Sequence, residues 1–406
     1  MGESFNELGI GSSFIEKLKE RSITEPTAIQ KLVIPSLLAK GKIVFRSATG
    51  TGKTFAYLLP ALQTAEKNTE KRQERGPSIL VCAPTLELCS QIKTEADFLS
   101  DLPSALLIGS ASLDKQIENL KRNKPALVVG NPGRLLTLIK MKKLPITELR
   151  FLILDEADRL TARECLEDTK ELLALIGRYA KEDLSLAACS ATVSIKTRRQ
   201  LEPLFETAEI IESDDHEILR ERIEHWALFS EKRKKVQTLR SLLAALRTKK
   251  SRFKALVFTS RNDEAGNVLS KLQYHHVSAA GLFGKIEGKP LASAERREAL
   301  DFFRQGKIEA LVSTDLAARG LDIPDISCVI ALDVPENGEI YIHRCGRTGR
   351  AGKRGIMISI GDETNLRRLA SLEKRLKIRV QPKYLYQGRV CVPPQMVNAV
   401  TPVQSC

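Results

Sequence analysis

Short apolar runs alternate with longer amphipathic segments along most of the chain. The apolar runs lie at residues 42–45, 79–83, 126–129, 151–154 and 186–188 in the first half, and at 255–258, 309–312, 328–331 and 355–359 in the second. Apolar runs of this length, separated by segments long enough for a helix, are typical of parallel strands joined by crossover helices. The pattern predicts two successive α/β domains, each a mainly parallel sheet flanked by helices.

The acidic stretch ESDDHE at residues 212–217 separates the two series of runs, which indicates a linker. We therefore place a first domain at residues 1–212, a linker at 213–222 and a second domain at 223–381. A length of 406 residues suits two domains of about 200 residues each. From 382 to 406 proline and valine recur without a clear period, so we expect a weakly ordered tail.

Two local features refine this outline. Ser13 and Glu16 have the spacing of a helix-capping box, which predicts a helix that opens there and ends before Pro26. The segment between Gly281 and Ala294 is longer than a simple strand-to-helix connection requires, so we expect an insertion loop.

The composition excludes several classes of protein. Hydrophobic residues make up 42% and charged residues 28%, and no apolar run approaches the roughly 18 to 20 residues of a membrane-spanning helix. The first residues lack a basic region followed by an apolar stretch, so we expect no secretory signal, no membrane association and a cytoplasmic location. Eight cysteines without C-x-x-C pairs, and few histidines, predict neither a zinc site nor a disulfide framework.

The formal net charge of +14 suggests a polyanionic partner, because clustered Lys and Arg attract phosphate backbones. The excess lies almost wholly in the second half: residues 1–212 hold 30 Lys and Arg against 28 Asp and Glu, and residues 213–406 hold 34 against 22. Basic runs such as residues 232–235 and 247–254 are usually solvated helix faces. Aromatic residues are only 5%, so we expect RNA to be recognised mainly through its phosphates and 2′-OH groups.

The stretch SATGTGKT at residues 47–54 follows an apolar run and precedes a helix-compatible segment. A glycine-rich turn in this position directs backbone N–H groups at an anion, which is the arrangement of a P-loop. Lys53 would reach the β- and γ-phosphates, and the Thr54 hydroxyl would bind Mg²⁺. The nucleotide-binding residues predicted here are Thr49, Gly50, Thr51, Gly52, Lys53 and Thr54.

Mg²⁺ bound to a nucleotide needs a carboxylate at the end of a neighbouring strand, which Asp155 supplies after the run FLIL. Glu156 follows directly and is placed to orient or deprotonate the attacking water. These residues predict a nucleoside triphosphatase that uses ATP and Mg²⁺, with Thr54 and Asp155 as metal ligands and Lys53, Asp155 and Glu156 in catalysis.

The sequence Asp155-Glu156-Ala157-Asp158, followed by Ser190-Ala191-Thr192, resembles the DEAD-box ATP-dependent RNA helicases of superfamily 2. The similarity continues in order from residue 5 to about residue 360. It implies two tandem RecA-like domains, RNA-stimulated ATP hydrolysis, and RNA held mainly by its backbone as a single strand or short duplex.

Upstream, Pro26-Thr27-Ala28-Ile29-Gln30 resembles the family's Q motif, in which the glutamine reads adenine. By this resemblance Gln30 would bind the base, Phe5 would help to shape its pocket, and Ile23 would stand where an aromatic residue is common.

Two stretches in the second half resemble the family's motifs V and VI, namely STDLAARGLD at 313–322 and HRCGRTGR at 343–350. The resemblance implies that Arg347 and Arg350 are catalytic arginine fingers and that Asp322 contacts the ribose. It also implies a set of residues that couple the two domains: Asp158, Ser190, Thr192, His343 and Arg344.

The RNA contacts implied by the resemblance are Thr85, Gly109, Gly133, Arg134, Arg296 and Thr314, with Arg297 an equal candidate beside Arg296. Leu86 stands where the family usually has an arginine on the RNA backbone, Ser110 replaces a glycine, and Asn131 replaces a threonine. Loss of one charge-assisted phosphate contact should weaken RNA binding and reduce its salt dependence by about one unit of slope.

The sequence therefore predicts an ATP-dependent RNA helicase that locally unwinds short duplexes or remodels RNA–protein complexes. Two alternatives remain open at this point: an ATP-gated RNA clamp or assembly scaffold with little unwinding, for which Leu86 and the other altered contacts are the hint, and a DNA translocase with the same domains. The physiological RNA and any protein partners are not encoded in a recognisable motif.

Overall fold

A computed structural model describes residues 4–46, 52–68, 76–179, 183–190, 195–212, 222–247, 253–283, 285–286, 289–290, 293–318, 323, 325–349 and 353–393. Residue contacts divide the chain into two compact units, Met1–Asp214 and Asp215–Cys406, which we describe one at a time. The division falls inside the predicted linker, most of which lies outside the described residues. No described helix combines the length and the apolar character that a bilayer crossing demands.

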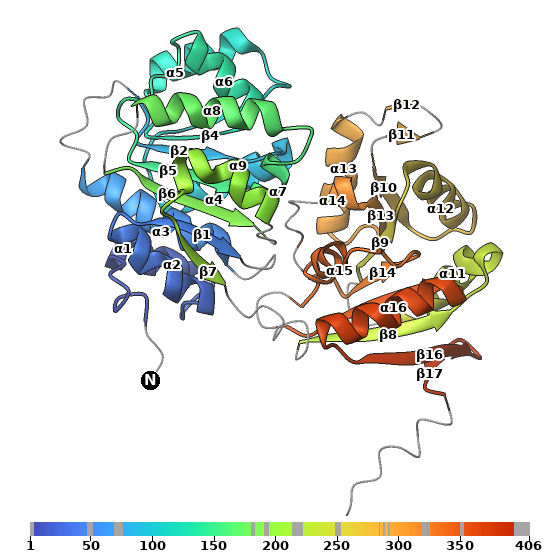
Figure 1. The fold of residues 1–406 in the computed structure, drawn as a ribbon. Helices are drawn as coiled ribbons and strands as arrows, with labels where there is room; N and C mark the ends of the chain where they lie inside the picture. The colour runs from blue at the N-terminus through green and yellow to red at the C-terminus, as the bar shows by residue number, and fades with distance from the viewer. Residues whose placement is uncertain are drawn as a thin grey trace, which may run out of the picture. The chain divides into compact units, whose positions relative to one another are not determined.

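The first unit is built on a seven-stranded sheet in which every paired strand is parallel (Figure 1). Its strands, in spatial order, are β3 (Ser104–Leu107), β4 (Leu127–Gly130), β2 (Ile79–Cys82), β5 (Phe151–Asp155), β6 (Ser185–Ser190), β1 (Lys42–Arg46) and β7 (Glu209–Glu212). Because the strands are parallel, all their carboxyl ends lie at one edge of the sheet.

Helices cover both faces of this sheet, and the burial of β2 shows why. All four of its residues are buried, with Ile79 and Val81 in one core and Leu80 and Cys82 in the other. The first core also takes side chains from α1 (Ser12–Glu20), α2 (Ala28–Leu38), α3 (Lys53–Lys67) and α4 (Leu86–Leu99). The second takes them from α5 (Leu113–Asn123), α6 (Pro132–Lys140), α7 (Ala157–Leu160), α8 (Leu166–Tyr179) and α9 (Ile195–Phe205).

The second unit contains an eight-stranded, mostly parallel sheet. Its order is β10 (Ala279–Leu282), β13 (Ala310–Thr314), β9 (Ala255–Thr259), β14 (Cys328–Ala331), β15 (Gly355–Gly361), β8 (Ile223–Phe229), β16 (Val380–Tyr386) and β17 (Arg389–Cys391), and only β17 is antiparallel to its neighbour. One face carries α13 (Ser293–Arg304), α15 (Gly338–Cys345) and α16 (Glu363–Leu376), and the other carries α11 (Lys235–Leu246) and α12 (Asn262–Tyr274). Two short elements, the 3-10 turn η2 (Lys232–Lys234) and α14 (Asp315–Ala318), complete the unit.

The two-domain, mainly parallel α/β architecture predicted from the sequence is confirmed, and each of the nine predicted strands is present. Strands β3, β7, β8, β10, β16 and β17 were missed. Several of these lie at or near a sheet edge, where one face stays polar and the apolar run is interrupted. Where an insertion loop was predicted, β11 (Lys285–Ile286) and β12 (Lys289–Pro290) pair as a small antiparallel ribbon.

Two local predictions were wrong. The first helix begins at Ser12 after Gly11, with no side-chain cap, and the capping box instead joins Thr27 to Gln30 at the start of α2. The tail expected from residue 382 continues as sheet up to residue 391, because β16 pairs with β8 and then turns back to pair with β17. Residues 394–406 lie outside the described part of the chain.

Candidate functional site

Sheet order places the predicted nucleotide residues side by side. Strands β5, β6 and β1 are neighbours, so Asp155 and Ser190 end adjacent strands, next to the strand that leads into the predicted P-loop. The carboxyl ends of β2, β4 and β3 continue the same edge. The loops after them carry Thr85, Arg134 and Gly109, so the candidate RNA residues share that edge with the candidate ATP residues.

The Asp155 carboxylate is 4% exposed and is held by three donors. The Tyr57 hydroxyl donates to Oδ2 at 2.8 Å, while the Glu156 backbone N–H and the Cys189 thiol both donate to Oδ1 at 2.8 Å. Burial, followed by the charge of Asp155, raises the pKa values of Tyr57 and Cys189 well above their ordinary range. Both groups therefore stay protonated and keep the carboxylate in one orientation.

Tyr57 links this carboxylate to the start of α3. Its hydroxyl also hydrogen-bonds with the Thr54 side chain, so Thr54 and Asp155 are gathered around one phenol. Sequence reasoning missed Tyr57. The available signal was its position three residues after Thr54, which puts both side chains on the same face of a helix.

Glu156 has φ 52° and ψ 52°, a left-handed conformation that is rare outside glycine. Strained residues of this kind concentrate at active sites, where the surrounding structure holds a side chain in a required direction. The carboxylate forms an ion pair with Arg159 at 3.8 Å, and both side chains are largely buried.

Gln30 is 1% exposed and already uses both ends of its amide. Its oxygen accepts from the Thr27 backbone N–H at 2.9 Å, and its nitrogen donates to the Gly52 carbonyl at 3.1 Å. Gly52 has φ +92°, and a Cβ there would lie 2.5 Å from the Gln30 amide nitrogen, so the position requires glycine. A primary amide can make two bonds from each end, so Gln30 retains one donor and one acceptor.

The other nucleotide residues fall into two groups. Phe5 is 2% exposed within the first core, and Ile23 packs against the same core. Lys53 begins α3, close enough to Cys189 for its charge to act on that thiol. Predicted residues Thr49, Gly50 and Thr51 lie outside the described part of the chain.

Arg134 organises the loops expected to touch RNA in the first unit. Its guanidinium donates to the carbonyls of Gly109 and Ala111 at 3.0 and 3.1 Å and to the Gln116 side chain at 3.3 Å. At Gly133 a Cβ would approach the Asp168 carboxylate to 2.7 Å. Thr85 caps α4 by accepting from the Leu88 N–H, and Leu86 is the first helical residue beside it.

In the second unit Thr314 ends β13 and is 6% exposed, while Arg296 lies on α13. His343 lies on α15, and the Arg347 Nε donates to the His343 carbonyl at 3.3 Å. Predicted residues Thr192, Asp322 and Arg350 lie outside the described residues.

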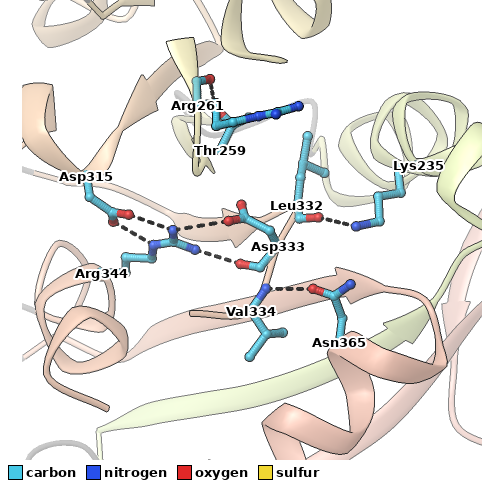
Figure 2. A network of polar contacts seen from close by, with 9 residues as sticks. All are labelled: Lys235, Thr259, Arg261, Asp315, Leu332, Asp333, Val334, Arg344 and Asn365. Carbon is cyan, nitrogen blue, oxygen red and sulfur yellow. Dashed lines mark hydrogen bonds and ion pairs between the residues drawn. The ribbon is translucent and has the colours of Figure 1, made fainter. Parts of the chain in front are cut away.

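Arg344 is 1% exposed and forms the centre of a charge cluster (Figure 2). Its Nε and Nη2 donate to the two Asp315 oxygens at 2.7 and 2.8 Å, and its Nη1 donates to the Asp333 carbonyl at 2.7 Å. The Asp333 carboxylate is a weaker partner at 3.6 Å. These bonds join the ends of β13 and β14 to α15, so in this structure Arg344 braces its own unit.

Two family models match the chain. The DEAD/DEAH box helicase model matches residues 27–201, and the model of the helicase conserved C-terminal domain matches residues 234–352. The chain belongs to the DEAD-box RNA helicases. The resemblance read from the motifs at Asp155 and His343 is thereby confirmed.

Curated relatives of this DEAD-box helicase cover nearly its whole length. It is 33% identical over 380 residues to the DEAD-box ATP-dependent RNA helicase CshC of Bacillus cereus, covering 92% of each chain. It is 32% identical to the probable ATP-dependent RNA helicase YfmL of Bacillus subtilis, covering 96% of this chain and 99% of the relative.

Solved structures give the same fold. Dbp5 of S. cerevisiae, bound to RNA and ADP BeF3, matches with a TM-score of 0.79 and 26% identity over 94% of this chain and 96% of that one. Mss116p, bound to ssRNA and AMP-PNP, matches in fold with a TM-score of 0.83 at 23% identity, over 98% of this chain and 82% of that one.

Proposed function

We propose that this DEAD-box protein is an ATP-dependent RNA helicase that couples ATP hydrolysis to local opening of short RNA duplexes or to remodelling of RNA–protein complexes. The observation that carries the proposal is the single sheet edge of the first unit, which presents Asp155 and Glu156 beside the loops of Thr85, Gly109 and Arg134. Family membership makes ATP the nucleotide and RNA the polymer.

The oxygen donors at this edge suit Mg²⁺. Thr54 and Asp155 both contact Tyr57, and they are a hydroxyl and a carboxylate, which are hard ligands. Among the described residues no three His, Cys, Asp or Glu side chains gather around a common point, as an all-protein metal cage would require. Mg²⁺ held by Thr54 and Asp155 would supply charge neutralisation on the phosphates, with water and phosphate oxygens as its remaining ligands.

Each proposed catalytic side chain has a distinct task. Lys53 binds the phosphates, and Glu156 orients the attacking water and accepts its proton, its direction fixed by the left-handed backbone. Gln30 uses its spare donor and acceptor for adenine, with Phe5 and Ile23 supporting that part of the unit. Arg347 and Arg350 supply positive charge to the transferred phosphoryl group, and neutralising both should abolish ATP turnover.

RNA would be held by its backbone at Thr85, Gly109, Gly133 and Arg134 in the first unit, and at Arg296 and Thr314 in the second. Asp158, Ser190, Thr192, His343 and Arg344 would couple RNA binding to hydrolysis, with Arg344 acting through the shape of its own unit. A cytoplasmic location stays a prediction.

The decisive experiment replaces Glu156 by Gln in the full chain. The variant should bind ATP and RNA but lose nearly all RNA-stimulated ATP hydrolysis, because the amide cannot take the proton of the attacking water. Glu118→Gln is a matched control, since Glu118 is exposed on α5 and should leave turnover unchanged. Unchanged hydrolysis in Glu156→Gln would remove the assignment.

A second function is favoured by one observation. Leu86 occupies the first turn of α4 at the candidate RNA edge, where the family resemblance leads one to expect an arginine. A weaker grip on RNA would suit an ATP-gated clamp that unwinds little. Strand displacement on short RNA duplexes separates the two functions, because a clamp would hydrolyse ATP and retain RNA without releasing the second strand.

A further inference from the structure

Three aromatic side chains of the second unit are exposed near the outer edge of its sheet. Phe229 at the end of β8 is 64% exposed, and Tyr384 and Tyr386 on β16 are 39% and 58% exposed. Large exposed apolar side chains gathered in one place mark a contact surface more often than scattered ones do.

Strand register places these rings on one face. Lys383 pairs with Leu228, so extending the parallel register by one residue sets Tyr384 beside Phe229. Tyr386 lies two residues further along β16 and therefore points to the same side. It pairs directly with Arg389 of β17, which adds an exposed cation to the face. We call Phe229, Tyr384, Tyr386 and Arg389 the edge face.

Packing explains why the edge face is open. Helix α16 packs on β15 and β8, and in Figure 1 the far ends of β16 and β17 lie beyond it. The opposite side of the same strands is filled, because Leu385 and Val390 pack with the α11 core and Lys383 lies 5.0 Å from the Trp226 ring centroid. The sheet is thus covered on one side at this edge and bare on the other.

The surroundings of the edge face are strongly basic. Residues 363–391 hold eight Lys and Arg against two Glu. Phe229 pairs with Gly361, and the pKa of the next residue, Asp362, is lowered mainly by hydrogen bonds from Asn365 and also by the charges of Lys235 and Lys232. The basic run at 232–235 therefore lies at the same end of the sheet, with Lys232 and Arg233 exposed.

We propose that the edge face, with Lys232 and Arg233, is a second RNA-binding surface that stacks unpaired bases on Phe229, Tyr384 and Tyr386 and holds phosphates with Arg389 and the basic run. The inference rests on the proposed function, in which RNA is the polymer acted on. Exposed rings on a bare sheet face stack two or three bases, and neighbouring cations follow the backbone.

Charge selects RNA over the other candidates for this face. A second copy of the chain would set one basic surface against another, which opposes pairing. An apolar peptide would leave the cations unused, whereas single-stranded RNA satisfies both the rings and the cations.

This surface is separate from the proposed contacts at Thr314. Four strands stand between β13 and β16, which corresponds to about 24 Å at the usual strand spacing. A long strand could occupy both places, and a short one could not. Binding at the edge face would then raise the affinity for long RNA through a high local concentration, without a change in the hydrolysis step.

The test measures binding of fluorescein-labelled oligouridylates of about 10 and about 30 nucleotides to the full-length protein by anisotropy. We expect Tyr384→Ala/Tyr386→Ala to weaken binding of the long strand at least about 5-fold per ring while leaving the short strand unaffected. Arg389→Ala should lower the salt slope for the long strand by about one. Tyr274→Ala is the matched control, since Tyr274 is 80% exposed on α12 of the same unit.

Each result decides. Tyr384→Phe/Tyr386→Phe should bind like the wild type, because stacking needs the ring and not the hydroxyl. Equal binding of long RNA by the wild type and the double alanine variant overturns the inference, as does loss of self-association or of polyglutamate binding in that variant with RNA binding intact. Absence of RNA-stimulated ATP hydrolysis in the wild type would instead remove the proposed function, so the two failures are distinguishable.

Discussion

The charge cluster around Arg344 allows two aspartates to be compared at one buried guanidinium. Asp315 binds it through two hydrogen bonds at 2.7 and 2.8 Å, whereas the Asp333 carboxylate stands 3.6 Å away (Figure 2). Burial raises the pKa of Asp333 above its ordinary value of 3.8 in spite of the opposing charge of Arg344. The two carboxylates should therefore differ sharply in what they contribute to stability.

Asp315→Asn should destabilise the second unit by about 3 kcal/mol. Breaking a buried ion pair costs about 3 to 5 kcal/mol, and the lower end applies because the Asp315 side chain is 22% exposed. With a urea m-value of about 2 kcal/mol/M, the unfolding midpoint should fall by about 1.5 M. Trp226 is the only tryptophan and lies on β8, so its fluorescence reports unfolding of the second unit within the full chain.

Asp333→Asn should change the free energy of unfolding by less than about 1 kcal/mol, because the carboxylate it removes is poorly paired and costly to bury. Since the folded pKa of Asp333 lies above its unfolded value, its protonated form favours folding. That contribution is fully present below pH of about 3.8 and is lost as pH rises through the folded pKa. The stability of Asp333→Asn relative to the wild type should accordingly increase from acid to neutral pH.

Asp301→Asn controls for the chemical change, because Asp301 pairs with Arg304 at 3.6 Å with both side chains about half exposed. An exposed pair of this kind contributes about 0 to 1 kcal/mol, so the midpoint should barely move. Equal midpoint shifts for Asp315→Asn and Asp333→Asn, or a larger one for Asp333→Asn, would refute the assignment of Asp315 as the principal partner of Arg344.

Three further predictions follow from the candidate site. Tyr57→Phe removes a hydrogen bond to the Asp155 carboxylate worth about 1.5 to 3 kcal/mol, so the Mg²⁺ concentration for half-maximal ATP hydrolysis should rise several-fold; lower thermal stability with an unchanged Mg²⁺ requirement would contradict a positioning role. Leu86→Arg should tighten binding of single-stranded RNA and add about one unit to its salt slope, and no gain would mean that this residue does not face the backbone. Among the described cysteines, Cys165 and Cys391 should react with Ellman's reagent in the folded protein, while buried thiols such as Cys89 and Cys328, whose pKa values burial raises to about 12, should react only on unfolding; early labelling of these two would show that the cores open readily.

Local spacing was enough to predict much of this molecule. Apolar runs such as 151–154 must be buried on both faces, so they predicted central parallel strands, and Asp155 and Glu156 took their place from the strand that precedes them. The motif residues could be matched to a family because P-loop and carboxylate chemistry demands particular residue types in a short stretch of chain. The strands β3, β7, β8 and β16 lack such a uniform apolar pattern, and pairing with neighbours distant in sequence makes them strands.

Tertiary structure decided the partners of individual side chains. That Tyr57 and Cys189 grip Asp155, that Gln30 binds the Gly52 carbonyl, and that Arg344 turns to Asp315 depend on contacts between residues 22 to 98 positions apart, which no local period encodes. The edge face has the same origin. A chain with 5% aromatic residues predicts no stacking surface, but the register between β8 and β16 brings Phe229 and Tyr384 together across 155 residues of sequence. Residue types fix which chemistry is available, and the pairing of distant strands fixes where it is assembled.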